Sequence, residues 1–303
     1  MPARFTSARF VGREGAFARL AAALDAAADG RARTVLVSGS GGVGVSRFLD
    51  ESAARLALLP EPFAVIRGGA RAAGTERPYA PLIRALEPTL LQLPDGELSA
   101  VLATGAEDLV RMLPRLAPRV EQLGRLPPIP TTTSPERRQA RVFESVLGVL
   151  GRLSERQAIL LVLEDLHHAD AATRELVAFL ARIANQQRLC VVGTWQPDQL
   201  TRSHPLKATF ARIDGGRRRP ERIELDPLGR DELAALVEGI EGERPSAGVL
   251  VLVAERSGGS PLITEELVAA RRELSSASLT GTLEDLVVAR LARRTPECRR
   301  VLR

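Results

Sequence analysis

A glycine-rich turn between an expected strand and an expected helix constrains this chain more than any other stretch. Residues Thr34–Ser38 have the composition of a buried strand, and apolar residues at helical spacing follow the turn. The turn begins at Gly39 and has the spacing of the P-loop pattern G-x-x-x-x-G-K-[ST]. In such a turn the backbone N–H groups cradle phosphate oxygens at the positive end of a helix. The stretch therefore predicts an α/β fold with a nucleotide site after its first strand.

The turn lacks one side chain of that pattern, because Val45 stands where the lysine belongs. The lysine reaches the β- and γ-phosphates, whereas the next residue, Ser46, would place its hydroxyl on Mg²⁺. We expect the loss of the lysine to weaken triphosphate binding by about ten- to a hundredfold and to slow turnover by more. The residues expected at the phosphates are Gly39, Gly41, Gly42, Gly44, Val45, Ser46 and Arg47.

A second motif is an apolar run, Ala158–Leu163, that ends in two acids, Glu164 and Asp165. Phosphoryl transfer needs one acid for the Mg²⁺ shell and one group that activates the attacking water. The register assigns the metal to Glu164 and the water to Asp165. Glu164 is one methylene longer than the aspartate usual at the metal position, a change that suits the strict octahedral geometry of Mg²⁺ poorly.

Strand-like runs alternate with helical patterns along the chain, at 34–38, 63–67, 158–163, 189–193 and 222–225. This order predicts a parallel sheet flanked by helices, with ligands at the carboxyl ends of the strands. The stretch from Tyr79 to Gln157 reads as a large helical insertion, interrupted by the linker 127–135. We expect a nucleotide-binding domain at 1–228 and, at 229–303, a smaller helical lid domain and the start of a further domain. Because 283–303 still reads as an amphipathic helix, we expect a longer protein.

Composition narrows the environment and the partners of the chain. The formal charge of +5 comes mostly from scattered arginines, and the dense run 217–219 reads as a solvated turn, so we expect no direct DNA binding. Two cysteines are too few for a disulfide framework. No signal peptide or membrane-spanning run is apparent, so we expect a cytoplasmic protein without a membrane partner.

Two further groups of polar residues allow more than one interpretation. His167, His168 and Asp170 could suggest a metal site, but adjacent histidines usually point apart, so a structural role is favoured. Gln196 follows the strand at 189–193, where ATPases of the AAA type place a polar sensor for the γ-phosphate. A simple strand-to-loop turn explains Gln196 equally well.

Seven motifs, in this order, resemble the STAND-class, AAA-type P-loop ATPase module of large LuxR-type (LAL) bacterial transcription regulators. They are FVGRE at Phe10–Glu14, the glycine turn, RPYAPL at Arg77–Leu82, EDLHHAD at Glu164–Asp170, GTWQP at Gly193–Pro197, DPL at Asp226–Leu228 and GSPL at Gly259–Leu262. The resemblance implies that ATP or ADP binds with Mg²⁺, and that an effector or DNA-binding domain lies outside this chain. It leaves a homo-oligomer open. It also adds Val11, Gly12, Arg13 and Pro261 to the expected nucleotide site.

The chain departs from that family where the nucleotide is expected. The family usually has Lys at Val45, Asp at Glu164, Trp at His168, Arg at Gln196 and Asn at Ser260. These departures favour weak binding and at most weak ATPase activity. Three hypotheses follow: a regulatory nucleotide switch, a pseudo-ATPase scaffold for protein assembly, and an ATPase in which an arginine replaces the lysine.

Overall fold

A computed structural model describes residues 10–72, 77–102, 107–122, 134–216 and 218–276 of the chain. It divides into two compact units. The first unit comprises Met1–Ala16, Ser38–Ser52 and Glu224–Arg303, and the second comprises Phe17–Val37 and Ala53–Ile223. Each unit is described by itself below.

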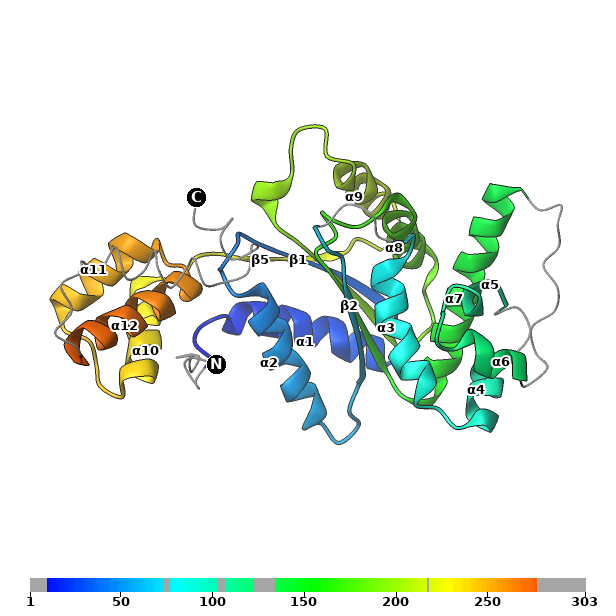
Figure 1. The fold of residues 1–303 in the computed structure, drawn as a ribbon, viewed down its shortest axis with the longest axis horizontal. Coiled ribbons are helices and arrows are strands. Elements are labelled where there is room, and N and C mark those ends of the chain that lie inside the picture. Colours follow the sequence, from blue (N-terminus) through cyan, green and yellow to red (C-terminus); the bar gives the residue numbers. More distant parts are fainter. Residues whose placement is uncertain (1–9, 73–76, 103–106, 123–133, 217, 277–303) are drawn as a thin grey trace. The chain divides into compact units, whose positions relative to one another are not determined.

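The fold is built on a parallel five-stranded sheet flanked by helices, as the sequence predicts (Figure 1). Its strand order is β2-β3-β4-β1-β5. All strands expected from the sequence are present, with ends shifted by a residue or two: β1 (Arg33–Gly39), β2 (Ala64–Gly69), β3 (Ile159–Glu164), β4 (Leu189–Trp195) and β5 (Glu221–Leu225).

Strands β3 and β4 form the buried centre of the second unit. Every residue of β4 is buried, and β3 is buried up to Leu163. Such continuous apolar runs are typical of strands that are covered on both faces of a parallel sheet. The parallel register pairs Gly69 of β2 with Glu164, and Leu163 with Gly193 of β4. The register therefore fixes which side chains surround the acidic end of β3.

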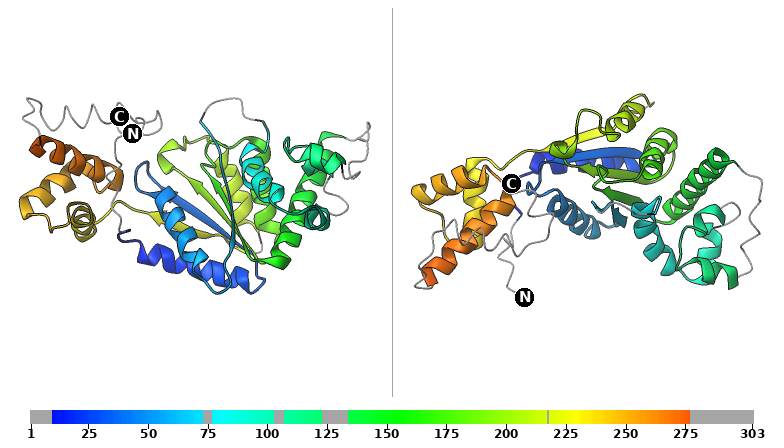
Figure 2. Two further views of the ribbon diagram at one scale, coloured as in Figure 1. Left: turned by 60° about the horizontal axis from the view of Figure 1, so that its bottom comes forward. Right: turned by 45° about the horizontal axis from the view of Figure 1, so that its top comes forward.

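The predicted helical insertion is confirmed in the described residues between β2 and β3. It comprises α3 (Ala80–Leu91), α4 (Asp95–Leu102), α5 (Glu107–Val110), α6 (Ala117–Gln122) and α7 (Pro135–Arg156). Ser134 caps α7 by accepting a hydrogen bond from the Arg137 N–H, and the buried face of α7 contacts α4 and α5. Figure 2 shows α4 to α7, in teal and green, gathered into one cluster. Most of the linker 127–135 lies outside the described residues.

Helix α3 packs closely on β2, and Gly68 makes this approach possible. A Cβ atom at Gly68 would lie 2.0 Å from the Pro81 carbonyl oxygen, so a larger residue would push α3 off the sheet. The Arg84 side chain of α3 also donates to the Gly69 carbonyl at 2.9 Å. The remaining helices of this unit include α8 (Ala171–Ile183), the 3₁₀ helix η1 (Pro197–Gln199) and α9 (Leu206–Asp214). Helix α1 (Glu14–Ala28) begins in the first unit and continues into the second.

The first unit contains a small helical group (Figure 1, yellow to orange). It consists of α10 (Arg230–Glu241), α11 (Ala247–Ser257) and α12 (Pro261–Ser276), which contact one another. The Gly229 N–H donates to Glu232, three residues into α10, and Ser246 caps α11. The helices expected at 231–239, 249–254 and 262–274 are thus confirmed, whereas the pattern at 283–303 lies outside the described residues. Helix α2 (Val45–Ala57) also begins in this unit.

Within the described part of the chain, no helix is both long and apolar enough to cross a membrane. The domain division at 228/229 stays a prediction.

Candidate functional site

The glycine turn joins β1 to α2, which begins at Val45. Gly42 and Gly44 have φ angles of 81° and 99°, which side chains other than glycine rarely adopt. The Phe48 N–H donates to the Gly44 carbonyl at 2.9 Å, so the helix starts directly at the turn. The first N–H groups of a helix have no partner within the helix, which makes this end suited to an anion such as phosphate.

The side chains after the turn face different surroundings. Val45 is half-buried, whereas Ser46 is exposed. The Arg47 guanidinium forms an ion pair with Glu265 of α12 at 2.8 Å and lies 5.8 Å from the centre of the Phe10 ring. Arg47 is therefore tied to α12, and its charge is partly neutralised there.

Arg13 brings a second guanidinium to the turn. Its Nη2 donates to the Val43 carbonyl at 3.2 Å. Burial lowers the pKa of Arg13, while the nearby carboxylates of Glu232 and Asp226 act to raise it. Arg13 also adopts a left-handed φ of 74°, a conformation that costs a residue with a side chain about 1–2 kcal/mol. Its surroundings thus hold a cation beside a loop that lacks the usual lysine.

The segment before α12 contacts the turn through one carbonyl. The Gly42 oxygen accepts hydrogen bonds from the Ser260 hydroxyl at 3.2 Å and from the Leu262 N–H at 3.3 Å. The neighbouring Gly259 carbonyl accepts from the Leu228 N–H at 2.8 Å, so the DPL and GSPL motifs pair with each other. The sequence places Ser260 in the GSPL motif and shows it as a departure from the family, but does not predict this hydrogen bond.

A small hollow of about 30 Å³ brings several of the expected residues together in the first unit. The glycine turn, the N-terminal motif, α10 and α12 all contribute to its wall. The volume of this hollow is far below the roughly 300 Å³ at which ligand pockets usually begin, so the hollow would have to widen to hold a nucleotide base. The lining residues are Phe10, Val11, Arg13, Val43, Gly44, Arg47, Leu228, Leu236 and Pro261.

In the second unit, Glu164 lies at the end of β3 and is bound by an arginine. Arg67 of β2 donates from Nε to Oε1 of Glu164 at 2.5 Å and from Nη2 to Oε2 at 2.9 Å. The two side chains are only 30% and 17% exposed. Both carboxylate oxygens are therefore engaged, and no local sequence signal predicts this partner.

Asp165 is positioned by a threonine of the next strand. Its N–H donates to the Thr194 hydroxyl at 3.0 Å, and the Leu166 N–H donates to the Thr194 carbonyl at 2.8 Å. Asp165 has a left-handed φ of 56°, so these bonds hold a strained backbone in place. Sequence reasoning overlooked Thr194, although a polar residue in the apolar strand β4 was a usable signal.

The two histidines that follow Asp165 have a structural role, since His167 is buried and His168 is half-buried. The Nδ1 atom of His167 accepts from the Gln196 N–H at 3.4 Å. Burial, with the nearby His168 and His204, lowers the pKa of His167 to about 4, so the ring is neutral at physiological pH. The rings of His167 and His168 lie 4.0 Å apart, so the expectation that they point apart is wrong.

Asp170, the third residue of that group, caps a helix. Its Oδ1 accepts from the Thr173 N–H at 3.0 Å at the start of α8, and its Oδ2 accepts from the Tyr79 N–H at 3.2 Å. In the described residues, no group of three or more His, Cys, Asp or Glu side chains is arranged to hold a metal ion. Asp170 thus joins the RPYAPL and EDLHHAD motifs.

Residues 9–192 match the model of the AAA ATPase domain family. The chain belongs to this family. Its fold is that of a nucleotide-binding module of the AAA type. No curated protein sequence matches the chain.

Two solved structures share the fold of this AAA domain at low sequence identity, and a third is less similar. The Walker-type ATPase paby2304 of Pyrococcus abyssi has a TM-score of 0.54 and 15% identity, over 95% of this chain and 73% of that one. Cdc6p of Pyrobaculum aerophilum has a TM-score of 0.54 and 14% identity, over 91% and 65%. A STAND protein with a tetratricopeptide repeat sensor, PH0952 from Pyrococcus horikoshii, has a TM-score of 0.48 and 11% identity, over 97% of this chain and 34% of that one. The chain thus spans less than two thirds of two of these proteins.

The AAA family generally implies nucleotide with Mg²⁺, and the residues present fit this unevenly. Ser46 is exposed after the glycine turn, as a metal-binding hydroxyl would be. Glu164 fits poorly, because both of its oxygens bind the Arg67 guanidinium, and a divalent cation beside that group would be repelled. The expected roles of Gln196 and Asp165 stay predictions.

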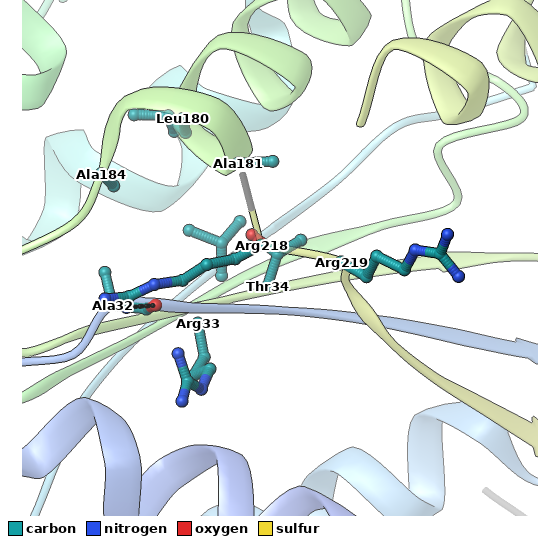
Figure 3. A pocket seen from close by; sticks show the side chains of 9 residues that line it. Ala32, Arg33, Thr34, Leu180, Ala181, Ala184, Arg218 and Arg219 are labelled. Atoms are coloured by element: carbon teal, nitrogen blue, oxygen red, sulfur yellow. Dashed lines mark hydrogen bonds between the residues drawn. The ribbon is translucent and has the colours of Figure 1, made fainter. Parts of the chain in front are cut away.

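A basic hollow at the other end of β1 belongs to the second unit (Figure 3). Arg218 extends across it and donates to the Ala32 carbonyl at 3.3 Å. Arg33 and Arg219 point away from each other rather than toward a common point. This arrangement resembles a solvated turn more than a site for one anion.

Proposed function

We propose that this AAA domain is a regulatory switch that binds ATP or ADP weakly at its glycine turn and hydrolyses ATP slowly or not at all. One observation carries the proposal: the Gly42 carbonyl of the turn accepts hydrogen bonds from Ser260 and Leu262 at the start of α12. A phosphate bound by the turn would change the surroundings of this carbonyl. The helical group α10–α12 would then respond to nucleotide.

A switch requires that nucleotide bind one conformation of the protein more tightly than another. The paired DPL and GSPL motifs are suited to act as a hinge, because Gly258 and Gly259 both have left-handed φ angles. The Arg47–Glu265 ion pair adds a second connection between α2 and α12. Loss or gain of these contacts would distinguish the two conformations.

Weak binding and slow hydrolysis follow from the side chains that are missing. A charged hydrogen bond contributes about 1.5–3 kcal/mol, which corresponds to roughly a ten- to hundredfold change in affinity. Val45 cannot make that bond, and Arg47 is paired with Glu265. Asp165 remains the candidate for activating water if any hydrolysis occurs.

The wider setting of the switch belongs to the same proposal. The motif order supports a LuxR-type transcription regulator in the cytoplasm, with an effector or DNA-binding domain outside these residues. Homo-oligomers would be compatible with this role. We expect neither membrane binding nor direct DNA binding by residues 1–303.

The test is a calorimetric titration of the whole chain with ATP and with ADP, compared with the variant Ser260→Ala. We expect both nucleotides to bind the wild type, and the variant to change affinity by about threefold or more, because a bond between turn and helix is removed. A matched control is Ser246→Ala, which removes the cap of α11 without touching the turn. Binding that is identical in wild type and Ser260→Ala would contradict the switch.

A second candidate is a pseudo-ATPase scaffold that binds no nucleotide. The small hollow and the pairing of Arg47 favour it. Absence of binding by both nucleotides in the titration would establish the scaffold instead of the switch.

A further inference from the structure

A large basic hollow lies between α1 and the start of β5, within the second unit. Its volume is about 560 Å³, and it shares three arginines with the small hollow of Figure 3. Among the described residues its charged lining comprises four arginines and one acid: Arg19, Arg33, Arg218, Arg219 and Glu221. We call it the arginine hollow, and the formal charge of its lining is +3.

Three of the four arginines keep an unbalanced charge. Arg19 forms an ion pair with Glu221 at 2.5 Å, which engages the acid of the lining. Arg218 donates to a backbone carbonyl at 3.3 Å, and this bond leaves its charge uncompensated. Within the described part of the chain, no carboxylate pairs with Arg33, Arg218 or Arg219. The positive charge is therefore available to a ligand.

Other arginines of the same unit have carboxylate partners. In α7, Arg141 pairs with Asp108 at 2.6 Å and Arg156 pairs with Glu97 at 2.7 Å. Like charges that share a hollow repel one another and disfavour the folded state. A ligand with carboxylates would replace this repulsion with charge-assisted hydrogen bonds in the arginine hollow.

The directions of the side chains indicate a ligand with several separate anionic groups. Arg33 and Arg219 point away from each other, so one small anion would not reach both guanidinium groups (Figure 3). In an extended peptide, the side chains on one face recur about every 7 Å. Successive carboxylates could then reach different arginines. Clusters of arginines recognise acidic peptide motifs in this way.

Nucleic acid suits the arginine hollow less well than a peptide does. Single strands usually bind in a basic groove where aromatic side chains stack on the bases. Among the described residues of the lining none is aromatic, and the wall formed by α1 includes the methyl groups of Ala22 and Ala23. A peptide in which acidic residues alternate with small apolar ones would match both the arginines and the alanines.

We propose that the arginine hollow is a docking site for an extended acidic segment of a partner protein. Carboxylates of that segment would bind Arg33, Arg218 and Arg219. The site uses residues of the second unit alone, and it does not depend on nucleotide binding at the glycine turn.

The first experiment measures the fluorescence anisotropy of a labelled peptide of alternating glutamate and alanine. The peptide is titrated with the whole chain, without nucleotide, at about 0.15 M salt. We expect it to bind about tenfold more tightly than the same peptide with glutamine in place of glutamate, because neutral amides make weaker hydrogen bonds to guanidinium groups. Equal binding of the two peptides, or no binding of either, would overturn the proposal.

A double variant locates the binding. We expect Arg33→Gln with Arg219→Gln to lower the affinity for the acidic peptide by about tenfold, because two charged contacts are lost. The matched control is Arg141→Gln with Arg156→Gln, which removes the same charge from arginines that already have partners. The control should change the affinity by less than about twofold.

An equal loss of affinity in the two double variants would show that only the overall charge of the protein matters, and would overturn the proposal. Arg218 and Arg219 are exposed, whereas Arg33 is half-buried. Should the variant with Arg33→Gln fail to fold, Arg218→Gln with Arg219→Gln replaces it.

A competition experiment separates the acidic peptide from other anions. We expect inorganic phosphate and a single-stranded oligonucleotide to displace the labelled peptide about tenfold less well than unlabelled peptide does, at equal concentrations of negative charge. An oligonucleotide that competes as well as the peptide would identify a nucleic-acid site, and phosphate that does so would identify a site for one anion. Either result would overturn the proposal. Because no nucleotide is present, these outcomes are independent of the proposed switch.

Discussion

The glycine turn and the acidic end of β3 have changed in opposite ways. The turn keeps the glycine spacing of the P-loop pattern and lacks its charged side chain, since Val45 replaces the lysine. The end of β3 keeps both carboxylates, but Glu164 has a charged partner of its own in Arg67. A backbone arrangement can thus be kept when a neighbouring side chain changes, whereas the ligands open to a carboxylate depend on what else that carboxylate binds.

The largest expected effect restores the missing charge at the turn. We expect Val45→Lys to raise ATP affinity by about ten- to a hundredfold, because a charged hydrogen bond to phosphate is regained. Calorimetric titration measures the change. Val45→Met is the control, since it lengthens the side chain without adding a charge. No gain in Val45→Lys would show that the backbone of the turn is not poised for phosphate.

The buried histidine beside the acidic end gives the next largest effect, on stability. The pKa of His167 is lowered to about 4 from 6.5, so the unfolded chain takes up this proton first as the pH falls. The free energy of unfolding is therefore highest above pH 6.5 and falls as the pH drops towards about 4. The expected loss between pH 6.5 and 5 is about 2 kcal/mol.

Denaturant unfolding of wild type and His167→Gln across this range checks the prediction. The difference between the two proteins should shrink as the pH falls, because glutamine does not titrate. A difference that is constant with pH would mean that His167 is protonated as easily in the folded chain as in the unfolded one.

A slightly smaller effect is expected at Thr194, which holds the backbone of Asp165. Thr194→Val removes the hydroxyl that accepts from the Asp165 N–H, and we expect a loss of about 1.5 kcal/mol in the free energy of unfolding. Thr194→Ser keeps the hydroxyl and should lose much less. Equal losses in the two variants would show that packing of the methyl group, and not the hydrogen bond, matters at this position.

The smallest effect is expected from the backbone of the turn. Gly44→Ala places a side chain at a φ of 99°, and we expect a loss of about 1 kcal/mol in unfolding free energy, together with weaker nucleotide binding. Gly15→Ala is the control, because Gly15 lies in α1 with open space around it and alanine should stabilise the helix. An unchanged nucleotide affinity in Gly44→Ala would argue against a role of the turn in phosphate binding.

Much of the fold could be predicted because the relevant signals are local. The apolar runs at β3 and β4 and the glycine turn before α2 are read from neighbouring residues, and the structure confirms the elements. The helical insertion was recognised from apolar spacing alone. The contacts of the candidate site could not be predicted in this way. A motif identifies the residues of a site but not the distant side chains that bind them.

Neighbouring residues alone are enough to predict the strands, the helices and the glycine turn, and to show that the lysine is absent. The folded chain is needed to see that Arg67 binds Glu164, 97 residues away, and that Ser260 binds Gly42, 218 residues away. Local propensity depends on adjacent residues, whereas these bonds depend on strand register and on the packing of α12. Such contacts form between whichever side chains the completed fold brings within hydrogen-bond distance.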